Sequence, residues 1–338
     1  MNQRTAFVFT ANTPQVAQAN LMLESLRDPQ RGNFEGDIWV ISTGLSERAK
    51  SYLDSQEINY LISKLNYVYE WKDWKKVAEA QPEYHEFSKK ANKEIAQRQA
   101  FQFYRNKRLS KLIIIDWVKK FGSQYDFIAL GDNDLYFQRD VNELFAKAHA
   151  RGEDQVHFWQ EEFKIQPGSN LWKKDFHYIR LHDAAELDFG TNEINIGFIL
   201  GKPQQIKKVF ENVKKYFFEL NSDLFACYAW HDQDLVRLDK AKRPEAYKLL
   251  DEGEIVHLCN GGDRVISEDF PMEFFHTKTK RKPYIVHFAG GAWKKYPSVA
   301  PSYKVDEDNF YFTNESVATY SKIRTGSLIS LFDEPSVS

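Results

Sequence analysis

A strand pattern that ends in an acidic pair constrains this chain more than any other feature of its sequence. Phe127-Ile-Ala-Leu130 is a short apolar run of the kind that forms a buried strand, and Gly131 ends it. Asp132 and Asp134 follow, and their carboxylates face one point because side chains two apart in an extended chain point the same way. Two like charges this close repel each other unless a cation lies between them. The pattern therefore predicts a site for a hard divalent ion such as Mg²⁺ or Mn²⁺.

An ordinary turn explains the same residues, because Asp-Asn-Asp after a glycine is common turn chemistry. The spacing alone does not separate the two interpretations. The position favours a ligand site, since ligands of open α/β sheets bind at the carboxyl ends of the strands. This run is the best candidate for a central strand in the chain.

Alternating strand and helix patterns predict the fold class. An order of strand, helix, strand, helix, strand in the N-terminal part implies right-handed βαβ units and a largely parallel sheet. The apolar stretch at 112–118 is expected to pack against this sheet just before the acidic strand. The fold class is therefore α/β, with helices flanking a mixed, mostly parallel sheet. The expected strands are 6–9, 37–41, 59–62, 127–130, 155–159 and 192–200, and the expected helices include 15–26, 141–150 and 203–221.

Composition excludes several classes of protein. The 338 residues carry a net charge of −2, so the net charge gives no overall electrostatic attraction to nucleic acid or an anionic membrane. Two cysteines provide neither a disulfide framework nor a metal cluster. No apolar run approaches the length of a membrane span and the N-terminus has no signal-peptide pattern, so we expect a cytoplasmic protein.

A second candidate site lies at residues 283–295. An apolar strand delivers His287 to its end, Gly290 and Gly291 allow close approach of the backbone, and Lys294 supplies a compact cation. A lone histidine at a strand end is usually structural. A histidine followed by two glycines and a lysine is more typical of an anion or metal site.

Two weaker signals lie between these stretches. Gly197 falls inside an expected strand together with Asn195, and glycine there often marks close approach by a ligand or another backbone. Asp232-Gln-Asp234 precedes a helix, where acidic residues are commonplace because they suit the helix dipole.

The loop at 10–13 would lie at the nucleotide-binding edge of the sheet, although it is equally explained as a connection.

Taken in order, these elements resemble the retaining glycosyltransferases of the GT-A fold, above all the family of glycogenin and the lipopolysaccharide galactosyltransferases (family 8). That family pairs an Asp-x-Asp strand end with a late His-x-x-Gly-x-x-Lys element, which residues 287–294 resemble with one extra residue. The matches span roughly residues 5–296. The other matches are Arg108-Leu109 for an Arg-Leu pair, Asn195-Ile-Gly197 for an Asn-Ala-Gly strand and Asp232-Gln-Asp234 for an Asp-Gln-Asp element.

The chain also departs from the family. Its late lysine falls one position further from His287, and the usual Lys-Pro-Trp ending is Lys294-Lys-Tyr296. Ile196 replaces the alanine of Asn-Ala-Gly, and the polar segment at 67–97 has no counterpart. These differences bear on the donor sugar and the acceptor more than on the fold.

The resemblance implies a single catalytic domain of the GT-A, Rossmann-like type over residues 1–300. A polar helical segment at 67–108 would be inserted in it, and residues 301–338 would form a tail with a disordered end. The implied reaction moves a hexose from a UDP-sugar to a hydroxyl acceptor, such as a glycan or a lipid-linked saccharide, in cell-surface polysaccharide or lipopolysaccharide synthesis. No transmembrane segment or nucleic acid is implied, and peripheral attachment to a membrane is left open.

The resemblance also implies roles for individual residues. Asp132, Asp134 and His287 would hold the metal, and the imidazole favours Mn²⁺ over Mg²⁺ because nitrogen suits transition metals better. The residues expected to act in catalysis or to face the reacting sugar are Asp234, Gln233 and Asn195. Those expected to hold the nucleotide, its diphosphate or the sugar are Thr10, Ala11, Asn12, Arg108, Asp132, Asn133, Gly290, Gly291 and Lys294.

Two other functions remain open from the sequence. A nucleotidyltransferase that forms nucleotide-sugars also uses a parallel sheet and paired acids, but it usually has a glycine- and lysine-rich phosphate loop that residues 10–14 do not provide. An inactive protein of the same fold that binds a sugar or nucleotide is the other alternative. Binding of UDP that requires a divalent ion distinguishes the enzyme from such a protein.

Overall fold

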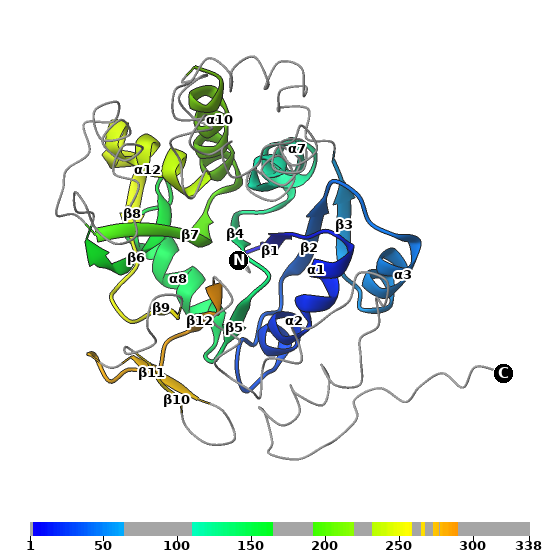
Figure 1. Cartoon of the computed structure of the whole chain (residues 1–338), viewed down its shortest axis with the longest axis horizontal. Coiled ribbons are helices and arrows are strands. Elements are labelled where there is room, and N and C mark those ends of the chain that lie inside the picture. The colour runs from blue at the N-terminus through cyan, green and yellow to red at the C-terminus, as the bar shows by residue number, and fades with distance from the viewer. Residues whose placement is uncertain are drawn as a thin grey trace, which may run out of the picture.

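The computed structural model describes residues 3–63, 110–164, 192–219, 232–258, 265–267, 273–276 and 278–289. Its centre is a seven-stranded sheet with the strand order β3-β2-β1-β4-β7-β6-β8 (Figure 1). β3, β2, β1 and β4 run parallel, β7 runs antiparallel to β4 and β6, and β8 runs parallel to β6. The predicted α/β class with a mostly parallel sheet is confirmed. The strands are β1 (Thr5–Thr10), β2 (Asp37–Ser42), β3 (Asn59–Ile62), β4 (Phe127–Gly131), β6 (Val156–Lys164), β7 (Asn192–Gly201) and β8 (Tyr247–Leu249).

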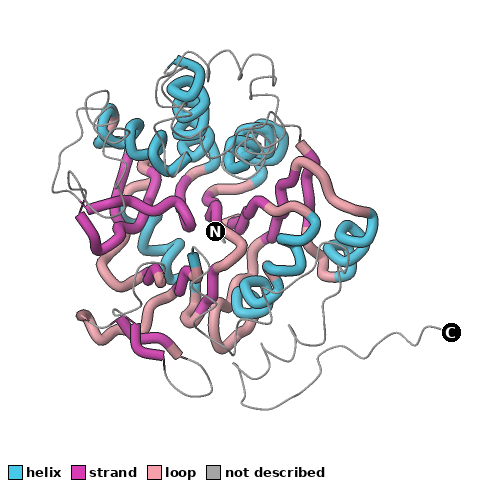
Figure 2. Tube along the Cα trace, in the orientation of Figure 1, coloured by secondary structure: helices cyan, strands magenta, loops and turns pink. Residues whose placement is uncertain are grey.

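The strands at the centre of this sheet are apolar on both faces because helices cover both sides (Figure 2). In β1, Ala6 and Val8 join one buried cluster, whereas Phe7 and Phe9 join the other. The first cluster is completed by helices α7 (Ile114–Phe121), α10 (Pro203–Glu219) and α12 (Asp232–Lys242). The second is completed by α1 (Thr13–Gln18), α2 (Asn20–Arg27), α3 (Glu47–Ser55) and α8 (Val141–Arg151).

A small three-stranded sheet packs into the second cluster. Its order is β5-β12-β9, with β5 at Leu135–Phe137, β12 at Ile285–His287 and β9 at Ile255–His257. β12 runs antiparallel to β5 and parallel to β9, so it brings the end of the described chain beside the acidic strand. A separate hairpin pairs β10 (Val265–Ser267) with β11 (Phe274–His276). The remaining described elements are the 3-10 helices η2 (Ser110–Ile113), η3 (Gly122–Gln124) and η5 (Pro244–Ala246).

Most expected elements are confirmed and one is wrong. The strands at 127–130 and 192–200 and the helix at 141–150 lie where the patterns predict them, and the run at 112–118 is helical with Trp117 fully buried. The single helix expected at 15–26 is instead two helices, with α1 ending in a turn at Ala19 before α2 begins. The segment at 67–108 and the tail at 301–338 lie outside the described residues. No helix within the described ranges is long and apolar enough to cross a bilayer.

Candidate metal centre

Three side chains converge at the carboxyl end of β4. Asp132, Asp134 and His287 each place a ligand atom within 4.8 Å of the others. His287 Nε2 lies 3.0 Å from Asp134 Oδ1 and 3.5 Å from Asp132 Oδ2. The aspartate side chains are 31% and 25% exposed, whereas the histidine side chain is only 3% exposed. The two carboxylates are therefore partly exposed to solvent, whereas the protein surrounds the imidazole.

Strand pairing explains why residues so distant in the chain meet. β12 runs antiparallel to β5, and His287 is the pairing partner of Leu135, which directly follows Asp134. The Phe288 amide then donates a hydrogen bond to the Asp134 carbonyl oxygen, 2.9 Å away. The ends of the acidic and histidine strands are thereby joined by backbone hydrogen bonds. The two stretches singled out in the sequence form one site.

Strand β7 forms the back wall of this site. The Asp132 amide donates to the Gly197 carbonyl oxygen at 2.8 Å. A β-carbon added to Gly197 would lie 2.3 Å from Cε1 and 2.7 Å from Nδ1 of His287, so only glycine leaves room for the ring. The predicted close approach at this glycine is real, but a histidine side chain makes it. Asn195 is buried beside it, and its Oδ1 accepts a hydrogen bond from the Gly197 amide at 2.6 Å.

Lys111 is a member of the site that the sequence analysis missed. It belongs to η2 and is 5% exposed. Its Nζ lies 2.6 Å from Asp132 Oδ1 and donates to the Ile196 carbonyl oxygen at 3.0 Å. The one sequence feature that could have pointed to Lys111 is its place directly before an apolar run, on a helix that leads into the acidic strand. Lys111 occupies one oxygen of Asp132 and leaves Oδ2 facing the histidine.

The charges of the site balance within the protein. Burial alone would lower the pKa of His287, but the carboxylates of Asp134 and Asp132 outweigh burial and raise this pKa to about 10. Burial opposes ionisation of Asp132, yet the Lys111 ammonium and the imidazole hold the pKa of this carboxyl well below its usual value. Burial would also lower the pKa of Lys111, but Asp132 and then Asp232 raise it. An ammonium and an imidazolium therefore neutralise the paired acids.

The donor set fits a divalent ion. Two carboxylate oxygens and one imidazole nitrogen are suitable ligands for Mn²⁺, and the carboxylates also suit Mg²⁺. A metal ligand must be unprotonated, so binding of the ion would release the proton of His287. Since Lys111 holds Oδ1 of Asp132, that carboxylate offers the ion its Oδ2.

The predicted nucleotide loop lies beside the acidic loop, with two of its polar groups already engaged. Asn12 caps α1 in a capping box: its Oδ1 accepts from the Gln15 amide, and Gln15 Oε1 accepts from the Asn12 amide. Asn133 Nδ2 donates to the Gln15 carbonyl oxygen at 3.3 Å. Thr10 ends β1, and Ala11 is buried and donates its amide to Ile41. Nucleotide contact by these residues stays a prediction.

The Asp-Gln-Asp element begins α12. Asp232 is its first residue, and its carboxylate contributes to the raised pKa of Lys111. Gln233 and Asp234 are the residues of this element that the sequence predicts to act in the site; Gln233 is partly exposed, and only the backbone of Asp234 is described. Four other predicted residues lie outside the described part of the chain, namely Arg108, Gly290, Gly291 and Lys294.

Solved structures of low sequence identity share this architecture. The galactosyltransferase LgtC in complex with donor and acceptor sugar analogs matches with a TM-score of 0.55 at 13% identity, over 92% of this chain and 95% of LgtC. An active-site mutant of LgtC matches with a TM-score of 0.52 at 11% identity, over 84% and 87% of the two chains. The chain has the GT-A fold.

A third structure supports the same assignment of fold. The bifunctional glycosyltransferase WbbM matches at 15% identity and a TM-score of 0.50, over 86% of this chain and 46% of WbbM. The predicted resemblance to glycosyltransferases of the GT-A fold is confirmed at the level of the fold. Family models do not match the sequence, and neither do the sequences of curated proteins.

Proposed function

We propose that this chain is a metal-dependent, retaining hexosyltransferase that uses a UDP-sugar. The observation that carries the proposal is the convergence of Asp132, Asp134 and His287 at the carboxyl edge of a GT-A sheet. Structural neighbours that are glycosyltransferases, one of them bound to sugar analogs, support this reading over a nucleotidyltransferase. A set of buried, mutually oriented charged groups favours a working site over an inactive binding protein.

The metal would be held by Asp132 Oδ2, Asp134 Oδ1 and His287 Nε2. When bound, a divalent ion supplies Lewis-acid stabilisation of the diphosphate that leaves during transfer. The backbone of Gly290 and Gly291 and the Lys294 ammonium are proposed to bind the same diphosphate. Mn²⁺ is the proposed ion because of the imidazole ligand.

Lys111 is proposed to hold the transferred sugar while it orients Asp132. An ammonium has three donor positions, and Lys111 directs two of them at Asp132 Oδ1 and the Ile196 carbonyl oxygen. We assign the third to a sugar hydroxyl. This role replaces part of the one expected for Arg108, which stays a candidate for the same sugar.

The anomeric region of the sugar is assigned to the start of α12 and to β7. Gln233 and Asp234 keep their proposed catalytic roles, and Asp232 joins them because its carboxylate helps to raise the pKa of Lys111. Asn195 is buried against Gly197 and would limit the depth to which the sugar enters. Thr10, Ala11, Asn12 and Asn133 are proposed to form the wall of the nucleotide site.

The acceptor is proposed to be a glycan or a lipid-linked saccharide in synthesis of a cell-surface polysaccharide. Its hydroxyl would enter from the solvent side of the site, where the aspartates are partly exposed. One catalytic domain at residues 1–300, with 67–108 as an insertion and 301–338 as a tail, is the domain organisation proposed with this function.

Calorimetric titration with UDP tests the proposal. We expect UDP to bind tightly only in the presence of Mn²⁺, and GDP and ADP to bind at least tenfold more weakly. Asp134→Asn should abolish the dependence on metal and the transfer of sugar, whereas the matched variant Asp154→Asn, whose side chain is 88% exposed, should change neither. UDP binding that is equally tight without metal would refute the metal assignment. Selective binding of GDP or ADP would refute the choice of donor.

A further inference from the structure

A second histidine lies beside the candidate metal ligand. His257 ends β9 and is the pairing partner of His287 on the parallel strand β12. Partners on neighbouring strands lie about 4.8 Å apart with side chains on the same face. The two imidazole rings accordingly pack edge to face, with centroids 5.2 Å apart and planes at 67°.

Trp159 completes the enclosure of the His287 ring. Its centroid lies 6.2 Å from that of His287 and 5.5 Å from that of His257, and it is 3% exposed. The His287 imidazole therefore lies among the aspartates, Gly197 and two aromatic rings. Of the two aromatic rings, that of His257 is partly exposed and lies on the small sheet, whereas that of Trp159 is buried on a strand of the central sheet. The ring of His257 can therefore be substituted with less disturbance to the core than that of Trp159.

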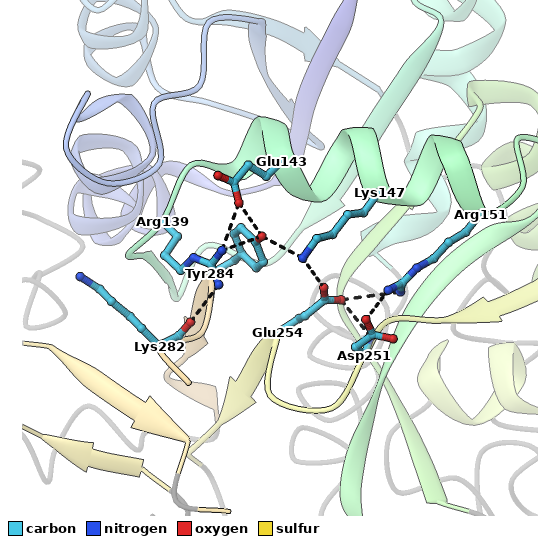
Figure 3. A network of polar contacts seen from close by, with 8 residues as sticks. All are labelled: Arg139, Glu143, Lys147, Arg151, Asp251, Glu254, Lys282 and Tyr284. Carbon is cyan, nitrogen blue, oxygen red and sulfur yellow. Dashed lines mark hydrogen bonds and ion pairs between the residues drawn. The ribbon is translucent and has the colours of Figure 1, made fainter. Parts of the chain in front are cut away.

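A polar network fixes the strands that carry the two histidines (Figure 3). Lys147 on α8 donates to Glu254 Oε1 and to the Tyr284 hydroxyl, each 3.0 Å away. Glu254 directly precedes β9 and Tyr284 directly precedes β12, and the Tyr284 amide donates to the Glu254 carbonyl oxygen at 2.8 Å. One lysine therefore joins the starts of both strands. These contacts fix the register of β9 against β12, and this register pairs His257 with His287.

We propose that His257 is a positioning residue of the metal centre, whose ring holds the His287 imidazole with Nε2 directed at the aspartates. The proposal rests on the metal site proposed above. The torsion that turns an imidazole about its Cβ–Cγ bond is broad, so a ring without lateral packing can rotate and withdraw its ligand nitrogen. The neighbouring ring restricts this rotation by contact. A phenyl group of similar shape should therefore replace it.

Titration with Mn²⁺ alone, followed by the electron paramagnetic resonance signal of the free ion, tests the inference. An edge-to-face ring contact is worth about a threefold to tenfold change in an equilibrium constant. We expect His257→Ala to weaken Mn²⁺ binding by about that factor and His257→Phe to stay within about twofold of the unsubstituted protein. Unchanged binding by His257→Ala would overturn the proposal. Binding by His257→Phe that is as weak as that of His257→Ala would also overturn it, since a nitrogen atom would then be required.

Controls separate this inference from the proposed function. Absence of Mn²⁺ binding by the unsubstituted protein refutes the metal site itself, whereas normal binding that is insensitive to His257 refutes only its positioning role. His149→Ala removes a histidine on α8 that pairs with Glu153, and it should bind Mn²⁺ normally. A loss in His149→Ala equal to that in His257→Ala would overturn the proposal. Thermal unfolding verifies each variant, and His257→Asn replaces the alanine variant if that one does not fold.

Discussion

Gly197 and His287 fit together so closely that a β-carbon on the glycine would lie 2.3 Å from Cε1 of the imidazole. No side chain tolerates that separation, so the absence of a side chain at position 197 is a condition for the histidine to occupy its place. The same glycine accepts a hydrogen bond from the Asp132 amide through its carbonyl oxygen. One residue of β7 therefore positions both kinds of candidate metal ligand.

Gly197→Ala should separate metal binding from stability. The new methyl group must displace the ring of His287, and overpacking of this kind costs about 1–3 kcal/mol of unfolding free energy. We expect the Mn²⁺ affinity to fall at least tenfold in a protein that still folds, as measured by Mn²⁺ titration and urea denaturation. Gly201→Ala on the same strand is the control, because its nearest contact would be an ordinary 3.4 Å to Ile206. Equal metal affinity in the two variants would contradict the packing argument.

Metal binding should strengthen as pH rises. His287 has a pKa of about 10 without metal, because the carboxylates of Asp134 and Asp132 outweigh burial, and its proton must leave before Nε2 can bind an ion. Below that pKa, the apparent Mn²⁺ affinity should rise about tenfold per pH unit, and titrations between pH 6 and pH 8 would show it. Affinity that does not vary with pH over this range would mean that His287 is not a ligand.

The stability of the metal-free protein should vary with pH in the opposite direction. The pKa of His287 is raised in the folded state, so its contribution is fully present below the ordinary histidine pKa of 6.5. That contribution is lost as pH rises from there through about 10. We expect the free energy of unfolding, measured with urea in the presence of a chelator, to fall over this window. His287→Gln should remove the dependence.

Lys111→Met should raise the affinity for Mn²⁺ and lower the rate of sugar transfer. The substitution leaves Asp132 without its ammonium partner, so Mn²⁺ alone should bind several-fold more tightly, while sugar transfer should fall by at least tenfold because the proposed sugar contact is lost. The metal-free protein should lose about 1–3 kcal/mol of stability, since Asp132 is mostly buried. Calorimetry with Mn²⁺ and a transfer assay measure the two effects. Lys119→Met on α7, an exposed lysine, is the matched control.

Tyr284→Phe should loosen β12 without touching a metal ligand. The hydroxyl of this buried residue donates to Glu143 at 2.7 Å and accepts from Arg139 at 2.8 Å and Lys147 at 3.0 Å. Its removal should cost about 1–2 kcal/mol of unfolding free energy, measured by urea denaturation. Tyr52→Phe, which removes a hydroxyl that donates to Asn20, is the comparison and should cost less. A larger loss from Tyr52→Phe would show that the network around Tyr284 adds little.

The parts of the site that could be predicted from the sequence are those whose residues are neighbours along the chain. The apolar run, the glycine and the acids around Asp132 adjoin one another, and His287 directly ends an apolar strand. Lys111 could not be found in this way, because its partners lie on β7 and after β4 and a lysine beside an apolar run resembles ordinary helix surface. His257 belongs to a strand of three residues, which is too short to show periodicity. Its relation to His287 arises only from strand pairing.

For the fold, too, local sequence patterns predicted some features and not others. Strands of the central sheet such as β4 and β7 could be predicted because each contains a run of apolar residues, Phe127–Leu130 in β4 and Phe198–Leu200 in β7. The break between α1 and α2 at Ala19 could not, since no proline or glycine marks it in the sequence. The antiparallel direction of β7 and the small sheet depend on contacts between distant segments. Local patterns do not contain that information.

The position of β12 determines when during synthesis the proposed metal site can first form. On the ribosome, the acids after β4 emerge long before residue 287, and chains of this size fold progressively as they emerge. Until β12 has inserted between β5 and β9, the acids lack their imidazole. A nascent chain, or one terminated early anywhere before His287, cannot assemble the ligand set. Binding of an ion at the proposed metal site would therefore be a late step of biogenesis, possible only after translation has passed this strand.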